Sequence, residues 1–162
     1  MPPKLTPAEM SRNLRDMALR VAPSELTLEP TEERPNVFGI LMDLGYGDAV
    51  ATLSVFADGS ASLYISTGGG VIGAGEHQTV RDAAEQLLAI VEAHHADFEP
   101  AKEVALPRGG RVHFHVRTFG GTLTAEADEQ ELGIGRHKLS PVFHAGHAVI
   151  TQMRLAAEGG GK

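Results

Sequence analysis

The sequence predicts a single α+β domain built on one five-stranded antiparallel sheet, in the order helix, three strands, helix, two strands, helix. Two groups of segments alternate apolar and polar residues with period two, which is typical of strands. Three other segments carry apolar residues at helical spacing behind capping residues. The chain of 162 residues fits one domain, with residues 1–5 and 157–162 expected to be disordered tails.

Composition excludes several classes of function. The chain has no cysteine, which excludes disulfide scaffolds, thiolate metal sites and cysteine nucleophiles. Its formal net charge of −7 works against nucleic-acid binding, which relies on clustered lysine and arginine. No apolar run reaches the roughly 18 residues of a membrane helix, and the first residues lack the apolar core of a secretory signal. We therefore expect a cytoplasmic protein that binds neither nucleic acid nor membrane.

The first helix is predicted to begin at Pro7, with Thr6 as its cap and Glu9 completing a capping box. Its apolar residues follow at helical spacing and are Met10, Leu14, Met17 and Val21. This narrow stripe either covers the sheet or packs against a second copy of the protein. Pro23 ends the helix, and residues 23–36 are expected to form a loop.

The next three strands are expected to form an antiparallel meander. Val37–Leu44 is almost continuously apolar, as in a central strand buried on both faces. Gly45–Asp48 turns the chain into Ala49–Ala57, where apolar and hydroxyl side chains alternate. Asp58–Gly59 is typical of a two-residue hairpin turn, and Ala61–Ile65 alternates again.

The second helix follows a glycine-rich segment, Gly68–His77. Thr79 is its expected cap, and Asp82 stands where a capping-box acid would be. Its apolar stripe consists of Val80, Ala84, Leu87, Leu88 and Val91. This pattern predicts an amphipathic helix packed on the sheet.

The last two strands are predicted over Val112–Phe119 and Leu123–Ala127. The long helical connection lets one of them pair beside the first strand of the meander. Residues 128–139 are expected to form a polar loop. Ser140 and Pro141 then begin the last helix as cap and first helical residue, and its apolar face is broad.

The glycine-rich segment is the first candidate binding site. Gly68, Gly70 and Gly73 have the spacing of a dinucleotide fingerprint, but that motif requires a parallel strand–helix–strand unit, and this segment follows an antiparallel meander. Two interpretations stay open: backbone N–H groups that bind an anion or small ligand, or a turn in which glycine supplies positive φ. The candidate ligand residues here are Gly68, Gly69, Gly70, Gly73, Gly75, Glu76 and His77.

A second candidate site lies on the fourth strand, where His113, His115 and Arg117 share one face. The two imidazoles are spaced to bind one metal ion. Candidates for a third ligand are His77, His144 and Glu76. The three side chains of the strand can also attract an anion. A solvated or helix-covered strand face explains the same pattern more simply, so we assign no metal and no cofactor.

Nucleophilic catalysis finds little support in the sequence, and no residue is assigned a catalytic role. The G-x-S-x-G motif is absent. A nucleophile and base can be assembled around the glycine-rich segment only loosely, from Ser66, Thr67, Glu76 and His77. His94 and His95 are expected to cap the end of the second helix. His144 and His147 lie close together on the last helix, where His147 is expected to be a core residue.

Two segments, Thr67–His77 and Leu139–Gly146, resemble a family of uncharacterised bacterial proteins over Val37–Arg154. We know of no activity in that family, so the resemblance implies none. More loosely, helices around a five-stranded antiparallel sheet are similar to profilin-like and roadblock-like modules, which implies profilin-like layering. Roadblock modules place two strands before the middle helix and three after it, the reverse of the order here. Membership in the roadblock-like group would imply a dimerising interaction module rather than an enzyme.

The sequence therefore predicts a non-catalytic binding or interaction module that forms a homodimer. A small anionic ligand is a further expected partner, with the glycine-rich segment and the His113 strand face as contact surfaces. The alternative is a small enzyme that acts on an anionic or nucleotide-like substrate through Gly68–Gly75, with His77 or Glu76 as acid and base.

Overall fold

A computed structural model describes residues 4–68, 70–71, 74–100 and 106–159. Within these residues the protein is an α+β fold with one antiparallel sheet, as predicted. Its helices are α1 (Pro7–Arg20), α2 (Gln78–Ala93), α3 (Glu129–Gly133) and α4 (Ser140–Gly159), with 3₁₀ helices η1 (Pro23–Leu26), η2 (Ala74–Glu76) and η3 (His95–Asp97). Its strands are β1 (Val37–Tyr46), β2 (Ala49–Phe56), β3 (Ala61–Ile65), β4 (Gly70–Val71), β5 (Glu99–Pro100), β6 (Arg111–Thr118) and β7 (Gly121–Asp128).

The strand order is β4-β3-β2-β1-β6-β7-β5, and every neighbouring pair is antiparallel. β1 lies at the centre, between β2 of the predicted meander and β6, so the connection through α2 does bring the fourth predicted strand beside the first. The predicted count of five strands is wrong even for the described residues, because the two-residue strands β4 and β5 extend the edges. Segments this short show no period-two pattern.

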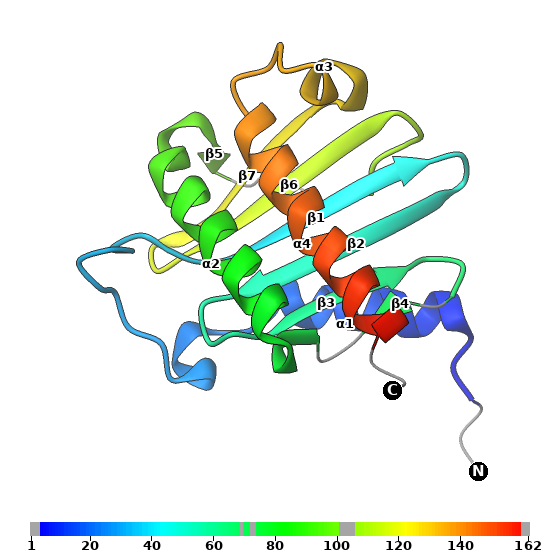
Figure 1. The fold of residues 1–162 in the computed structure, drawn as a ribbon, viewed down its shortest axis with the longest axis horizontal. Coiled ribbons are helices and arrows are strands. Elements are labelled where there is room, and N and C mark those ends of the chain that lie inside the picture. Colours follow the sequence, from blue (N-terminus) through cyan, green and yellow to red (C-terminus); the bar gives the residue numbers. More distant parts are fainter. Residues whose placement is uncertain (1–3, 69, 72–73, 101–105, 160–162) are drawn as a thin grey trace.

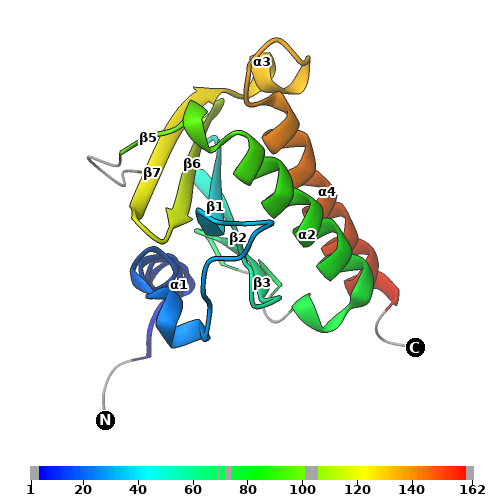
Figure 2. The same ribbon diagram turned by 90° about the vertical axis from the view of Figure 1, so that its left-hand side faces the viewer.

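The fold has three layers, with α2 and α4 on one side of the sheet and α1 on the other (Figure 2). In Figure 1, α2 and α4 lie side by side across the front of the sheet. Alternate residues of a strand point to the same face, so Val112, Phe114 and Val116 of β6 meet the predicted stripe of α2 in the main core. The opposite face, here called the α1 face, carries most of the polar side chains of the sheet.

Two predicted element boundaries are wrong. α2 begins one residue before Thr79, its N-cap is His77, and no side chain caps this end, so the expected capping box with Asp82 does not form. β1 continues through Tyr46, which confines the predicted turn to Gly47 and the residue after it. In both cases the regular element extends beyond the residue that local propensity favours as its boundary.

Both predicted long loops contain a short helix. Residues 23–36 include η1, and residues 128–139 include α3, whose N-cap Asp128 accepts a hydrogen bond from the N–H of Glu131. Neither helix is long enough to show an apolar helical period. α4 extends to Gly159, beyond the residue at which the C-terminal tail is expected to begin, and residues 1–3 and 160–162 lie outside the described residues.

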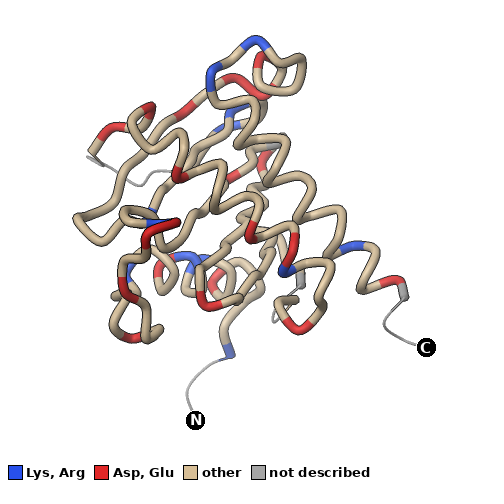
Figure 3. The backbone as a smooth tube through the Cα atoms, turned by 60° about the vertical axis from the view of Figure 1, so that its left-hand side comes forward, with Lys and Arg blue, Asp and Glu red and all other residues tan. Residues whose placement is uncertain are grey.

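Charged residues are spread along the described backbone, and several acidic ones follow one another on the segment after α1 (Figure 3). That segment carries Glu25, Glu29, Glu32 and Glu33, all exposed. None of the helices in the described part of the chain has the length and apolarity needed to cross a bilayer.

Candidate functional site

α1 packs on the sheet through a charged side chain rather than through its predicted apolar stripe. Its buried residues are Arg15 and Ala18. Met10 and Met17 of the stripe are 51% and 61% exposed. The guanidinium of Arg15 donates hydrogen bonds to the carboxylate of Asp43 on β1, at 3.1 Å from Nε and 2.8 Å from Nη2 to Oδ2. The helix therefore covers the sheet with one side and leaves two of the four stripe residues, Met10 and Met17, exposed.

Asp43 is the centre of a buried polar cluster on the α1 face. Thr52 of β2 donates a hydrogen bond of 2.7 Å to Oδ1, and Nε2 of His115 on β6 lies 3.1 Å from Oδ2. Burial raises the pKa of the Asp43 carboxyl, but hydrogen bonds and charge from His115 and Arg15 outweigh it and hold the pKa below its ordinary value. The cluster thus keeps a buried carboxylate ionised and joins α1 to three strands.

This cluster pairs a carboxylate with an imidazole, as many catalytic sites do, but its position suits an anchor. Asp43 is 0% exposed and His115 is 1% exposed. A general acid or base must reach the proton it transfers, and these groups lie sealed beneath Arg15. Removing one partner from a buried ion pair leaves an uncompensated charge and strongly destabilises the fold. The cluster therefore holds α1 in one position on the sheet.

Arg117 holds the other end of α1 on the same face. Its guanidinium donates hydrogen bonds to the carbonyl oxygens of Ala18 and Val21, the latter at 2.8 Å. Such carbonyls at a helix C-terminus lack partners within the helix. The guanidinium carbon also lies 5.1 Å from the centre of the Phe38 ring, within cation–π range. Arg117 therefore caps α1 from the sheet.

The predicted row of His113, His115 and Arg117 does lie on one face of β6, and each member contacts another group of the protein. Nε2 of His113 is 2.8 Å from Oε2 of Glu126 on β7. In the described part of the chain, no three histidine, aspartate or glutamate side chains are placed to hold a metal ion. These contacts favour a structural role for the row over an anion or metal site.

The described glycines of the glycine-rich segment have structural reasons for being glycine. Gly68 and Gly70 adopt φ of 117° and 133°, a backbone region that favours glycine. A Cβ on Gly70 would collide with the backbone of Leu63, and one on Gly75 would collide with the carbonyl of Gly59. This geometry favours the turn interpretation of the segment.

The two candidate sites are not brought together. Glu76 and His77 are exposed and precede α2, which covers the face of the sheet opposite to His113. Gly69 and Gly73 lie outside the described residues. The ligand role of both surfaces stays a prediction.

The other candidate side chains have local contacts. The hydroxyl of Ser66 accepts a hydrogen bond of 2.8 Å from a backbone N–H of β2. His94, just after α2, lies 3.1 Å from the carboxylate of Asp97. His147 is half-buried with its ring centre 4.5 Å from that of Phe143, and burial lowers its pKa. The position of His147 is therefore only partly that of the expected core residue, because its Nε2 is buried without a hydrogen-bond partner in the described structure.

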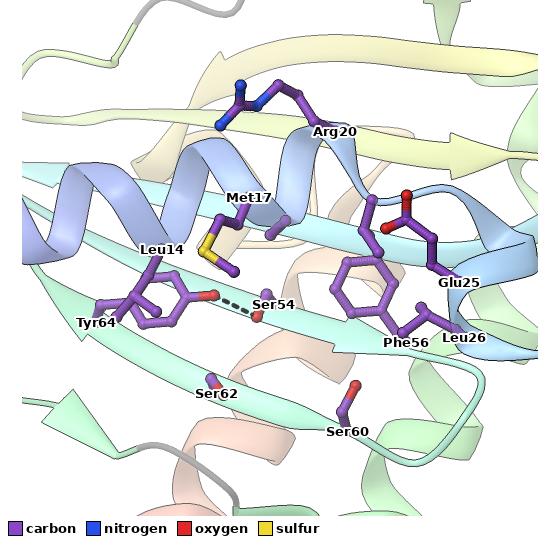
Figure 4. A pocket seen from close by; sticks show the side chains of 12 residues that line it. Leu14, Met17, Arg20, Glu25, Leu26, Ser54, Phe56, Ser60, Ser62 and Tyr64 are labelled. Carbon is purple, nitrogen blue, oxygen red and sulfur yellow. Dashed lines mark hydrogen bonds between the residues drawn. The ribbon is translucent and has the colours of Figure 1, made fainter.

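A groove runs beside α1, between this helix and strands β2 and β3 (Figure 4). It consists of two adjoining depressions of about 430 and 360 Å³ that share Leu14 and Tyr64. We call it the α1 groove. Figure 4 shows Leu14 and Met17 reaching from α1 toward Tyr64, with Phe56 and Leu26 at the far end. Its walls are therefore mainly apolar.

The floor of the α1 groove offers neutral hydrogen-bonding groups. The hydroxyls of Tyr64 and Ser54 lie 2.8 Å apart, and Ser60 and Ser62 line the floor beside them. Burial raises the pKa of Tyr64, which keeps the phenol uncharged. An apolar concavity of several hundred Å³ with a few polar groups is the usual character of a binding site.

Comparison with known proteins adds no family to this picture. No protein-family model, curated protein or solved structure matches this chain. The resemblance to uncharacterised bacterial proteins, and to profilin-like and roadblock-like modules, stays a prediction.

Neither the buried cluster around Asp43 nor the α1 groove is predicted by the sequence pattern. The sequence did contain one indication of the buried cluster: Asp43 is the only charged residue in the apolar run Val37–Leu44. An ionised side chain in a strand buried on both faces requires a partner. That partner, Arg15, is 28 positions away in the chain.

Proposed function

We propose that this protein is a non-catalytic interaction module that binds an amphipathic helical segment of a protein chain in the α1 groove. The observation that carries the proposal is the exposed stripe of Met10 and Met17 along an apolar concavity. Contiguous exposed apolar surface is typical of interaction sites. Methionine suits such a surface, because its flexible, polarisable side chain adapts to the shape of its partner.

The shape and charge of the groove indicate what it would bind. A groove walled by a helix can take the apolar face of another helix, with anchors three, four and seven residues apart. The acidic segment after α1, which includes Glu25 at the rim of the groove, favours a basic residue at one end of that helix.

The chemistry of the groove supports binding rather than catalysis. Among the described residues that line it, the charged ones are Arg20 and Glu25. Figure 4 shows Arg20 directed away from the floor. The nearest pairing of acid and imidazole, Asp43 with His115, is sealed under α1. Neutral hydroxyls and apolar walls can orient a bound chain, and burial raises the pKa of Tyr64, which makes its phenol a weaker proton donor than an ordinary tyrosine.

Selection from a phage-displayed library of random helical peptides tests this proposal. The protein is immobilised at low surface density, so that copies cannot meet. We expect enrichment of peptides that combine an apolar stripe with basic residues. Ser62→Trp should abolish their binding, because the indole fills the groove floor. Gln86→Trp on the exposed side of α2 is the matched control and should leave binding unchanged.

Absence of enrichment would reject the proposed function. So would peptides that bind the Ser62→Trp and wild-type proteins equally, because their site would lie elsewhere.

A further inference from the structure

We infer that the segment that fills the α1 groove is α1 of a second copy of this chain, related by a two-fold axis. This inference rests on the proposed function and names its partner. Met10, Leu14 and Met17 stand four and three residues apart on α1, which is the spacing that a helix-binding groove requires. The chain thus carries the kind of helix that its own groove fits.

The position of this stripe makes the surface self-complementary. Met17 lines one depression and Met10 the other, both from the side of α1 and both more than half exposed, and we call this exposed row the ridge of the groove. A two-fold axis pairs a surface with itself, so each ridge can enter the groove of the other copy. A ridge beside a groove therefore satisfies the geometric condition for a closed dimer.

Charge favours the antiparallel arrangement of the two helices. Lys4 precedes α1 and Glu25 follows it, and both side chains are exposed. When the helices run antiparallel, Lys4 of each copy lies toward Glu25 of the other, and opposite ends of the helix dipoles meet. A parallel arrangement would place like charges together. The two flanking charges, Lys4 and Glu25, thus favour the antiparallel orientation.

Sedimentation equilibrium of the full chain from about 1 μM to about 1 mM measures the predicted dimer. We expect a monomer–dimer equilibrium that Met17→Arg weakens about tenfold or more, because a cation would enter the apolar groove. Met17 is 61% exposed in the monomer, so this change does not disturb its packing. Leu155→Arg is the matched control, since Leu155 is 50% exposed on α4, and it should leave the equilibrium unchanged.

Charge reversal tests the orientation. Lys4→Glu should weaken the dimer about two- to fivefold, as expected for an exposed ion pair. Adding Glu25→Lys to that variant should restore the affinity, because each pair regains opposite charges. A double variant that dimerises no better than Lys4→Glu would overturn the antiparallel arrangement.

The absence of cysteine allows a direct test of proximity. Under mild oxidation, Met10→Cys mixed with Met17→Cys should form a mixed disulfide. Met10→Cys mixed with Leu155→Cys should not. Preferential linkage of Met10→Cys to itself would contradict the antiparallel helices.

A monomer at every concentration would overturn the inference, as would a dimer that Met17→Arg leaves intact. If that monomer still selects peptides that Ser62→Trp excludes, the proposed function stands and the second copy is the wrong partner. If it selects none, both are wrong.

Discussion

Asp43 is a charged residue at a fully buried position of the sheet, and its partners explain how the fold tolerates it. The carboxylate receives hydrogen bonds from Arg15 and Thr52 and lies against His115. Removing one member of such a group leaves the others buried without compensation. In the described structure, Nδ1 of His115 already lacks a hydrogen-bond partner. Losing another hydrogen bond would leave a second polar atom of the cluster buried and unsatisfied.

Asp43→Asn should lower the free energy of unfolding by about 3–5 kcal/mol at pH 7, because the guanidinium of Arg15 loses its buried counter-charge. Folding lowers the pKa of Asp43, so its contribution is complete above the pKa of an unfolded aspartate, about 3.9. That contribution disappears as the pH falls through the lower pKa of the folded state. Denaturant unfolding between pH 7 and pH 2.5 measures both effects.

The wild-type protein should therefore lose stability more steeply than Asp43→Asn at the acidic end of this range. Asp48→Asn, in the exposed turn after β1, is the control and should behave like the wild type. A loss of less than about 1 kcal/mol in Asp43→Asn would show that the cluster is not an anchor.

At the scale of elements, α1 differs from α2 and α4 in how it is held. α2 packs through a fully apolar stripe, whereas α1 buries only Arg15 and Ala18 and relies on contacts with Asp43 and Arg117. Polar contacts are directional, so they fix the position of a helix while covering little of its apolar surface. This mode of attachment is what leaves the stripe of α1 available for a partner.

Arg117→Lys should loosen the C-terminal half of α1, because an ammonium group cannot replace a guanidinium that donates to two carbonyl oxygens and covers a ring. We expect amide hydrogen exchange in α1 to accelerate about tenfold or more, which corresponds to the loss of one or two hydrogen bonds. Exchange in α2 should not change. Arg111→Lys, on the same strand but paired with exposed Glu126, is the control, and equal exchange in both variants would contradict this role of Arg117.

Across the whole molecule, the two sides of the sheet contribute unequally to stability. The main core joins α2, α4 and one face of five strands, whereas the buried apolar group under α1 consists of Ala18, Phe38, Leu41 and Phe56. Apolar burial is the dominant favourable contribution to folding. We therefore expect the helix pair and the sheet to supply most of the stability and the apolar packing of α1 to supply less.

Two truncations measure this asymmetry. Leu87→Ala should cost about 2–5 kcal/mol, because Leu87 is 1% exposed in the main core and leaves a cavity. Met17→Ala should change stability by less than about 0.5 kcal/mol. Urea unfolding at about 1 μM protein keeps self-association from contributing. Comparable losses in the two variants would mean that α1 is part of the core.

The predictable parts of this protein are those set by residues close together in the chain. Period-two alternation predicted the meander, and the capping box of Thr6 and Glu9 predicted the start of α1, where both hydrogen bonds form. β4, β5 and α3 escaped prediction because they are too short to show a period. The start of α2 was misplaced because packing of the whole helix outweighs the preference of one capping residue.

What the sequence determined by itself is therefore the α+β class, the antiparallel meander and the apolar face under α2 and α4, because local periodicity specifies which side chains share a face. Only the tertiary structure decided that Arg15 meets Asp43, that Arg117 caps α1, and that a groove opens beside that helix. These contacts join residues far apart in the chain, whose proximity depends on strand order and helix placement. Periodicity therefore predicted the layers, but the groove between α1 and the sheet depends on how those layers pack in the tertiary structure.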